Sequence, residues 1–204
     1  MGNFRKSSLW SSERPYGHHR FEHWYRDNTV YFITARCRNK FPAFASEAAQ
    51  FVFWDRFNHY AQQYGFTPFV TSLMSNHYHS LGYLKFGEHL GQMMRRLHGS
   101  VAKLVNDLLP ERLTPFWYDT GKQGYFDGCI RDEAQCRRAY QYTLTQCARH
   151  KVCSDWQRFA NTHVNTEIDA VIKRALEKHA FMTGVPYERY ARERRARYSI
   201  IDSQ

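Results

Sequence analysis

Hydrophobic and polar positions along the chain predict strands interleaved with helices. Residues 30–37 are rich in β-branched and aromatic side chains, which predicts a strand. Two similar runs, at 69–74 and 77–84, are separated only by the polar pair at 75–76. So short a connection can join only antiparallel strands, so these two runs should form a hairpin.

The helical period appears in several other segments. Apolar residues recur at helical spacing over residues 53–64, and Gly65 follows as a C-cap. Residues 90–108 keep the 3.6-residue period most clearly, with Leu104 and Leu108 inside the apolar stripe. The other expected elements are β-like stretches at 116–118 and 123–127 and helices that begin near Asp132 and at Thr166. Together these elements predict an α+β fold, an antiparallel sheet packed against helices in a ferredoxin-like arrangement.

Charge changes this picture by indicating a partner. The chain has 29 Lys+Arg against 19 Asp+Glu, a formal net charge of +10 that favours a polyanion. On charge alone, a basic protein without such a partner is an equal alternative. We expect a basic arm at residues 1–27, a central domain at 28–155 and a basic helical extension at 156–204.

Cysteine usage and hydropathy indicate the compartment. The five cysteines are an odd number without a CxxC pair, which disfavours both a disulfide framework and a structural zinc site. No apolar run is long enough to span a bilayer, and the N-terminus lacks an apolar signal region. We therefore expect a cytoplasmic, nucleoid-associated protein that has no membrane partner.

The most specific chemistry begins in the predicted hairpin. His77 and His79 lie two positions apart on a strand, so their rings point to the same face while Tyr78 points to the other. Two imidazoles presented side by side make half of a metal site. Taken alone, such a pair is more often an accident of sequence than a metal site.

The helix that follows Asp132 could complete that site. Its apolar stripe includes Tyr140, whereas Tyr142 and Gln146 lie one turn apart on the other side. If this helix crosses the sheet face that carries the two histidines, Gln146 supplies a third ligand beside Tyr142. Either residue alone would more often be an ordinary surface side chain.

The chemistry explains why these groups would occur together. A phenol with a pKa near 10 is a poor nucleophile at neutral pH and needs electrophilic help at phosphorus. A divalent ion held by two imidazoles and an amide oxygen can supply that help. Because no thiolate or carboxylate ligand is apparent, the donor set favours Mg²⁺ or Mn²⁺ over a tight structural zinc.

These segments resemble the HUH single-strand DNA transposases with one catalytic tyrosine, in particular the REP-associated tyrosine transposases and their insertion-sequence relatives. The similar segments are Met-Ser-Asn-His-Tyr-His-Ser at 74–80, Gln-Gly-Tyr-Phe-Asp at 123–127, Ile-Arg-Asp-Glu at 130–133 and Tyr-Thr-Leu-Thr-Gln-Cys at 142–147. Their order and separations agree with the family over roughly residues 28–155. The sequence departs from the family pattern at Ser75, Ser80, Gly128 and Cys147.

The resemblance implies a function and a set of site residues. Tyr142 would be the nucleophile, His77, His79 and Gln146 the metal ligands, and the reaction a cut in single-stranded DNA that leaves a 5′-phosphotyrosine. The partner would be single-stranded or hairpin DNA, and the active unit a monomer or a homodimer. Candidate DNA contacts are Arg36, Arg38, Arg95, Arg96, Lys122, Arg149, Arg194 and Arg195. Two alternatives stay open, namely a hairpin-binding regulator that does not cut and a metal-dependent hydrolase that uses water.

Overall fold

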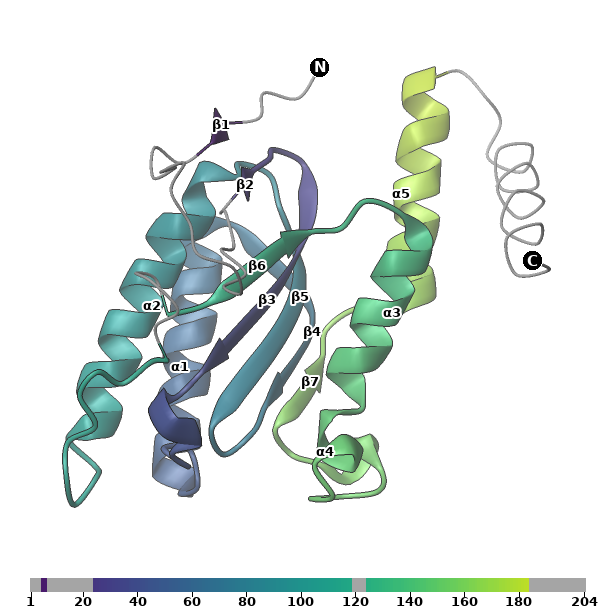
Figure 1. Ribbon diagram of the computed structural model, residues 1–204. Coiled ribbons are helices and arrows are strands. Elements are labelled where there is room, and N and C mark those ends of the chain that lie inside the picture. The colour runs from purple at the N-terminus through teal and green to yellow at the C-terminus, as the bar shows by residue number, and fades with distance from the viewer. Residues whose placement is uncertain (1–4, 7–23, 119–123, 184–204) are drawn as a thin grey trace, which may run out of the picture. The chain divides into compact units, whose positions relative to one another are not determined.

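The computed structural model of the chain describes residues 5–6, 24–118 and 124–183 (Figure 1). In this part, the main feature is a five-stranded antiparallel sheet with the strand order β6-β3-β5-β4-β7. Its strands are β3 (Thr29–Arg36), β4 (Phe66–Leu73), β5 (His77–Leu84), β6 (Phe126–Cys129) and β7 (Thr162–Val164). A two-stranded pair joins β1 (Arg5–Lys6) to β2 (Trp24–Tyr25). The expected antiparallel α+β architecture is confirmed.

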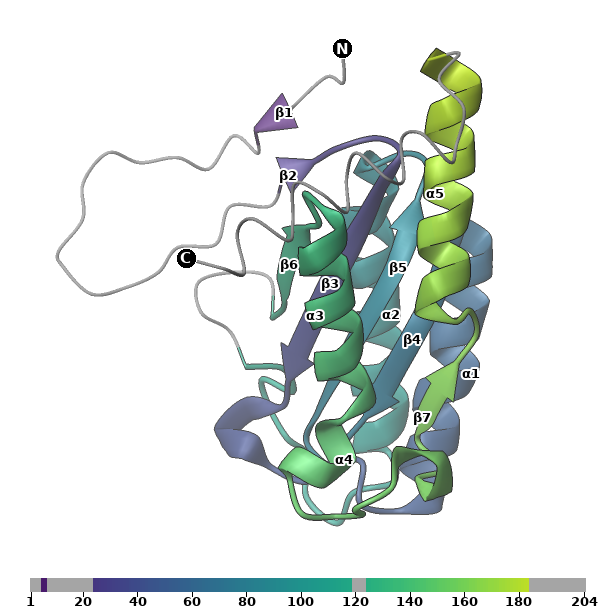
Figure 2. The same cartoon turned by 90° about the vertical axis from the view of Figure 1, so that its right-hand side faces the viewer.

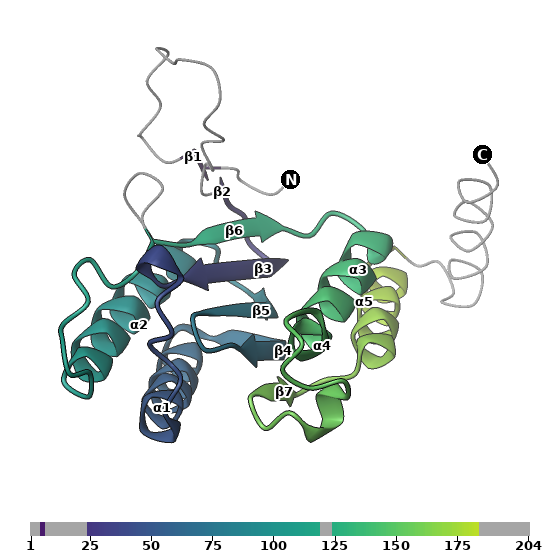
Figure 3. The same ribbon diagram turned by 60° about the horizontal axis from the view of Figure 1, so that its bottom comes forward.

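Helices cover both faces of the sheet (Figures 2 and 3). One face carries α1 (Glu47–Tyr64) and α2 (Glu88–Asn106), and the other carries α3 (Glu133–Leu144), which is followed by the short α4 (Gln146–Arg149). Single 3₁₀ turns lie at η1 (Arg38–Lys40) and η2 (Trp156–Arg158). The helix α5 (Ile168–Thr183) belongs to a separate compact unit that begins at Thr166.

Local signals fixed several element boundaries. Gly65 ends α1 in the left-handed conformation at φ 72°, as expected for a glycine C-cap. The Asp132 side chain accepts a hydrogen bond of 2.7 Å from the Gln135 backbone N–H and so caps α3. The hairpin of β4 and β5 is antiparallel, with Leu73 opposite Tyr78.

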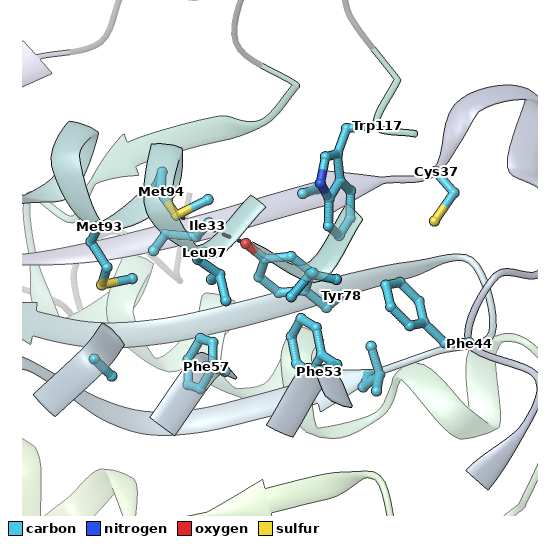
Figure 4. Packing of buried hydrophobic residues seen from close by; sticks show 14 of the residues in the cluster. Ile33, Cys37, Phe44, Phe53, Phe57, Tyr78, Met93, Met94, Leu97 and Trp117 are labelled. Atoms are coloured by element: carbon cyan, nitrogen blue, oxygen red, sulfur yellow. Dashed lines mark hydrogen bonds between the residues drawn. The ribbon is translucent and has the colours of Figure 1, made fainter. Parts of the chain in front are cut away.

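The main core lies between the sheet and the layer formed by α1 and α2 (Figure 4). Tyr78 is fully buried there, with its ring 4.8 Å from that of Phe53. Its hydroxyl is 3.0 Å from Nε2 of His98 on α2. Because successive strand residues alternate between faces, this anchoring of Tyr78 turns its two histidine neighbours toward α3.

Three sequence-based expectations need correction. Leu104 and Leu108 are 38% and 48% exposed although they keep the apolar period, because Val105 rather than Leu104 enters the core in the last turn of α2 and Leu108 lies beyond the helix end at Asn106. The domain boundary expected after residue 155 falls inside the first compact unit, which runs to Asn165. The reason is that β7 pairs with β4 and adds an edge strand to the sheet.

The third correction concerns the helix after Asp132, which is interrupted at Thr145. The Thr143 hydroxyl donates to the Ala139 carbonyl at 2.9 Å, and the Thr145 hydroxyl donates to the Gln141 carbonyl at 2.8 Å. Hydroxyls that bond the carbonyl four residues earlier weaken and bend helices. The backbone restarts as α4, so Gln146 does not occupy the position of an ideal continuous helix.

Candidate active site

Two histidines from β5 form the centre of the site. His77 and His79 are only 9% and 4% exposed, and their ring centroids are 5.1 Å apart. Both face α3, on the side of the sheet opposite to Tyr78. The expected presentation of two imidazoles on one face is therefore confirmed.

A neighbouring polar group holds each histidine by its Nδ1 atom. Nδ1 of His77 lies 2.6 Å from Oδ1 of Asn76, whose own amide donates to the Lys40 carbonyl at 3.0 Å. Because Oδ1 can only accept, His77 carries its proton on Nδ1. Nδ1 of His79 lies 2.7 Å from the Thr34 hydroxyl on β3. Such contacts leave Nε2 available on both rings and are typical of histidines that bind metals.

The electrostatic environment keeps both rings neutral. Burial, followed by the charge of the nearby His150, lowers the pKa of His77 to about 4. Burial and the neighbouring His77 lower the pKa of His79 to about 3. At neutral pH both rings therefore have a free lone pair, which is the form that binds a metal ion.

Gln146 brings an amide oxygen to these rings. It is 1% exposed, and its Nε2 donates to the Tyr142 carbonyl at 2.8 Å, where α3 ends. The Gln146 side chain also lies close enough to His77 to favour the protonated ring. Its Oε1 is buried and has no hydrogen-bond partner of normal geometry. A buried acceptor without a partner costs stability unless something else binds it.

Tyr142 lies beside His79 at the edge of a groove. Their ring centroids are 5.0 Å apart, and Tyr142 is 37% exposed and lines the groove, so a substrate there can reach its side chain. The Arg149 guanidinium lies over the Tyr142 ring, 4.8 Å from its centroid. Tyr140, two positions earlier, is 3% exposed, which confirms its expected place in the core.

His150 is a neighbour that the sequence reasoning missed. It is exposed, and its ring centroid is 4.8 Å from that of His77. The available signal was its position four residues after Gln146, which itself follows Tyr142 by four. That spacing places all three on one side of a helix.

The residues present fit a divalent metal ion. Two neutral imidazoles and an unpartnered amide oxygen converge from β5 and α4, and His77, His79 and Gln146 are the groups that would hold the ion. Within residues 5–6, 24–118 and 124–183, no three His, Cys, Asp or Glu side chains gather closely enough to hold one by themselves. Gln146 is therefore the group that would complete the set.

The structure brings only some of the expected DNA contacts to this site. Arg149 lines the groove, and Arg36 lies near enough to His77 to lower its pKa. Arg38 donates to the Thr114 carbonyl in a loop beside the end of β3. Arg95 and Arg96 are exposed on α2, on the opposite face of the sheet. The others, Lys122, Arg194 and Arg195, fall outside the described residues.

An antiparallel sheet that presents two histidines to a tyrosine-bearing helix is the arrangement that the resemblance to HUH tyrosine transposases implies. Comparison with solved structures supports the fold. A REP-associated tyrosine transposase bound to a REP hairpin matches with a TM-score of 0.57 at 14% identity, over 75% of this chain and 82% of that one. The chain therefore has the fold of that transposase.

Another match is a protein from Deinococcus radiodurans R1 described as a candidate transposase, with a TM-score of 0.42 at 14% identity over 67% of this chain and 98% of that one. No protein-family model and no curated protein matches the sequence significantly. No helix in the described part of the chain is both long and apolar enough to cross a bilayer.

Proposed function

We propose that this protein cuts and rejoins single-stranded or hairpin DNA through a covalent bond to Tyr142, with a divalent metal ion, Mg²⁺ or Mn²⁺. The observation that carries the proposal is the buried, unpartnered Oε1 of Gln146 beside two neutral histidines, next to an accessible tyrosine. A purely structural glutamine would be expected to pair its oxygen.

The reaction that this geometry supports is a transesterification. The Tyr142 oxygen attacks a phosphodiester, the new bond joins that oxygen to phosphorus, and the bond from phosphorus to the 3′ oxygen breaks. The phenolic proton leaves to solvent, and the 3′ oxygen takes up a proton to become a hydroxyl. The 5′-phosphotyrosine keeps a phosphate ester that a second 3′ hydroxyl can attack to rejoin the strand.

The residues around Tyr142 would have separate roles in this step: they would hold the metal ion, orient its ligands and contact the phosphate. When bound, a divalent ion would polarise the phosphoryl oxygen and neutralise developing negative charge. Asn76 and Thr34 keep the two histidines oriented, through contacts of 2.6 and 2.7 Å. Arg149, whose guanidinium lies over the Tyr142 ring, would contact a phosphate held against the phenol.

DNA as the partner has independent support. The net charge of +10 favours a polyanion. The solved relative in fold is bound to a REP hairpin. Arg149, which is exposed and lies over the Tyr142 ring, lines the same groove as His79.

The test compares two tyrosines that are two positions apart. Wild-type protein incubated with end-labelled single-stranded DNA and Mn²⁺ should give a covalent adduct on a denaturing gel, and EDTA should prevent it. Tyr142→Phe should give none, whereas Tyr140→Phe, which changes a core ring that is 3% exposed, should still form it.

Three outcomes would overturn the proposal. An adduct in Tyr142→Phe would mean that another residue is the nucleophile. Cleavage without any adduct would indicate a hydrolase that uses water. DNA binding by the wild type without cleavage under any metal condition would indicate a regulator.

A further inference from the structure

The groove beside Tyr142 is larger than the part that Tyr142, His79 and Arg149 line. It has a volume of about 700 Å³ and is lined by residues of α3 and of the strands β3 and β6 at the edge of the sheet. Its lining includes Phe32, Phe126, Gly128, Gln135 and Arg138, none of which has a role in the proposed bond exchange. We call it the Phe32 groove.

The floor of the Phe32 groove has a recess beside an aromatic ring. Phe32 on β3 is directly opposite Gly128 on β6, and opposite residues of antiparallel strands point to the same face. Because Gly128 has no side chain, it leaves the floor of the groove open up to the Phe126 ring, which lines the groove together with Phe32. A Cβ atom at position 128 would meet only the Phe126 ring, at 3.4 Å and 3.6 Å.

The glycine at 128 is not required by the backbone. The described glycines with positive φ are Gly65 and Gly124, so the φ of Gly128 is one that other residues adopt. The lack of a side chain here therefore shapes the groove without being needed for the strand.

The Phe32 ring also connects the recess to the site. It is half-buried, lies parallel to the His79 ring with centroids 5.7 Å apart, and meets the Tyr142 ring edge-on at 6.0 Å. A planar group in the recess would thus lie immediately beside the reacting phenol.

Two arginines line the side of the groove that α3 and α4 form. Arg138 is exposed on α3 one turn before Tyr142, the Arg149 guanidinium lies 4.8 Å from the centroid of the Tyr142 ring, and both arginines line the groove. The rise from Arg138 to Tyr142 is ~6 Å along the helix, which is comparable with the separation of neighbouring phosphates in an extended single strand. Aromatic surfaces next to a row of cations are the usual means of binding single strands.

We propose that the Phe32 groove is a nucleotide subsite, in which the base next to the scissile phosphate enters the recess at Gly128 and stacks on Phe32 while Arg138 holds the adjoining phosphate. The inference rests on the proposed function in taking single-stranded DNA as the partner. It does not depend on catalysis, since stacking and phosphate contact occur before any bond changes.

The experiment measures binding in a background that cannot cut. Tyr142→Phe protein in EDTA is titrated by fluorescence anisotropy with a labelled oligothymidylate and with an abasic strand of the same length. The two strands carry the same phosphates and differ only in their bases. The parent protein should bind the oligothymidylate about tenfold more tightly, as expected for a stacked base.

Two further substitutions separate the base from the phosphate. Gly128→Leu fills the recess, so it should reduce affinity for the oligothymidylate to nearly that for the abasic strand and leave abasic binding unchanged. Arg138→Ala should weaken binding to both strands and reduce the slope of log affinity against log salt by about one.

The matched control for Arg138 is its neighbour on the same helix. Arg137 is also exposed, but it pairs with Glu133 at 2.9 Å and does not line the groove. Arg137→Ala makes the same change in net charge, and it should leave both affinities and the salt slope near those of the parent. Thermal melts check that each variant is folded, and Arg138→Ala carries the test if Gly128→Leu is not.

The outcomes distinguish this inference from the proposed function. Preference for the oligothymidylate that persists in Gly128→Leu, or equal effects of Arg137→Ala and Arg138→Ala, would overturn the subsite while leaving the nucleophile assignment intact. Preference that is lost in Gly128→Leu supports the subsite even if wild-type protein forms no adduct. Absence of binding to either strand at low salt would overturn both.

Discussion

Replacing Gln146 with methionine should stabilise the metal-free protein and weaken its response to Mn²⁺. The glutamine is 1% exposed, and its Oε1 is buried without a partner. Methionine is similar in length and is apolar, so it removes the unpaired oxygen without opening a large cavity. A gain in stability on losing a polar group would indicate that the group is retained to bind something.

The expected change in the free energy of unfolding of Gln146→Met is the difference between two opposing contributions. Removing an unpaired buried acceptor recovers ~1–3 kcal/mol, and losing the 2.8 Å hydrogen bond from Nε2 to the Tyr142 carbonyl costs ~0.5–1.5 kcal/mol. The net gain of about 1 kcal/mol corresponds to a rise in Tm of ~2–4 °C for a chain of this size. For the wild type, Mn²⁺ at ~100 times its Kd should add ~2.7 kcal/mol.

The assay is thermal unfolding in EDTA and in a series of Mn²⁺ concentrations. Wild type should gain ~5–10 °C at saturating Mn²⁺, while Gln146→Met should start higher and gain much less. The control is Gln63→Met, which changes an exposed glutamine on α1 and should alter neither value. A lower Tm of Gln146→Met in EDTA, or a full Mn²⁺ shift in this variant, would refute the reasoning.

Three further predictions test the core, the buried histidines and the basic surface. Tyr78→Phe leaves Nε2 of His98 unpaired and should cost ~1–3 kcal/mol in urea unfolding; an unchanged midpoint would contradict this. Burial lowers the pKa of His98 from 6.5 to about 3, so the unfolded chain takes up the proton first. This group therefore contributes no change in stability above pH 6.5 and a fall of ~1.4 kcal/mol per pH unit below it. The lowered pKa values of His77 and His79 add to that fall, so urea titrations at several pH values should show a loss steeper than one histidine gives, and a flat profile below pH 6.5 would exclude it. Arg149→Ala should weaken binding to single-stranded DNA more than Arg96→Ala, which changes the opposite face; equal losses in anisotropy would place the strand elsewhere.

Local sequence determined the elements that present the chemistry. The period of two on a strand places His77 and His79 on one face whatever the rest of the chain does. Helix phase likewise separates Tyr140, 3% exposed, from Tyr142, 37% exposed. Gly65 and Asp132 set helix ends through conformations and hydrogen bonds that involve only nearby residues. Such signals act over a few residues, so they can be read from the chain alone.

Only the tertiary structure decided what these faces meet. The sequence placed Gln146 one turn after Tyr142, but not the burial of its Oε1 without a partner, which depends on how α4 restarts after Thr145 against the sheet. The closeness of His150 to His77 has the same origin.

Apart from the hairpin of β4 and β5, the sequence also did not predict which strands pair with each other. The pairing of Phe32 with Gly128 opens the recess beside Tyr142, and it joins two strands that lie far apart in the chain. The pairing of β7 with β4 likewise joins distant segments, and because of it the first compact unit runs to Asn165 and does not end at residue 155. Periodicity records which side of an element is buried, whereas register and strand order are fixed by the total burial and hydrogen bonding of the folded chain, to which distant segments contribute together.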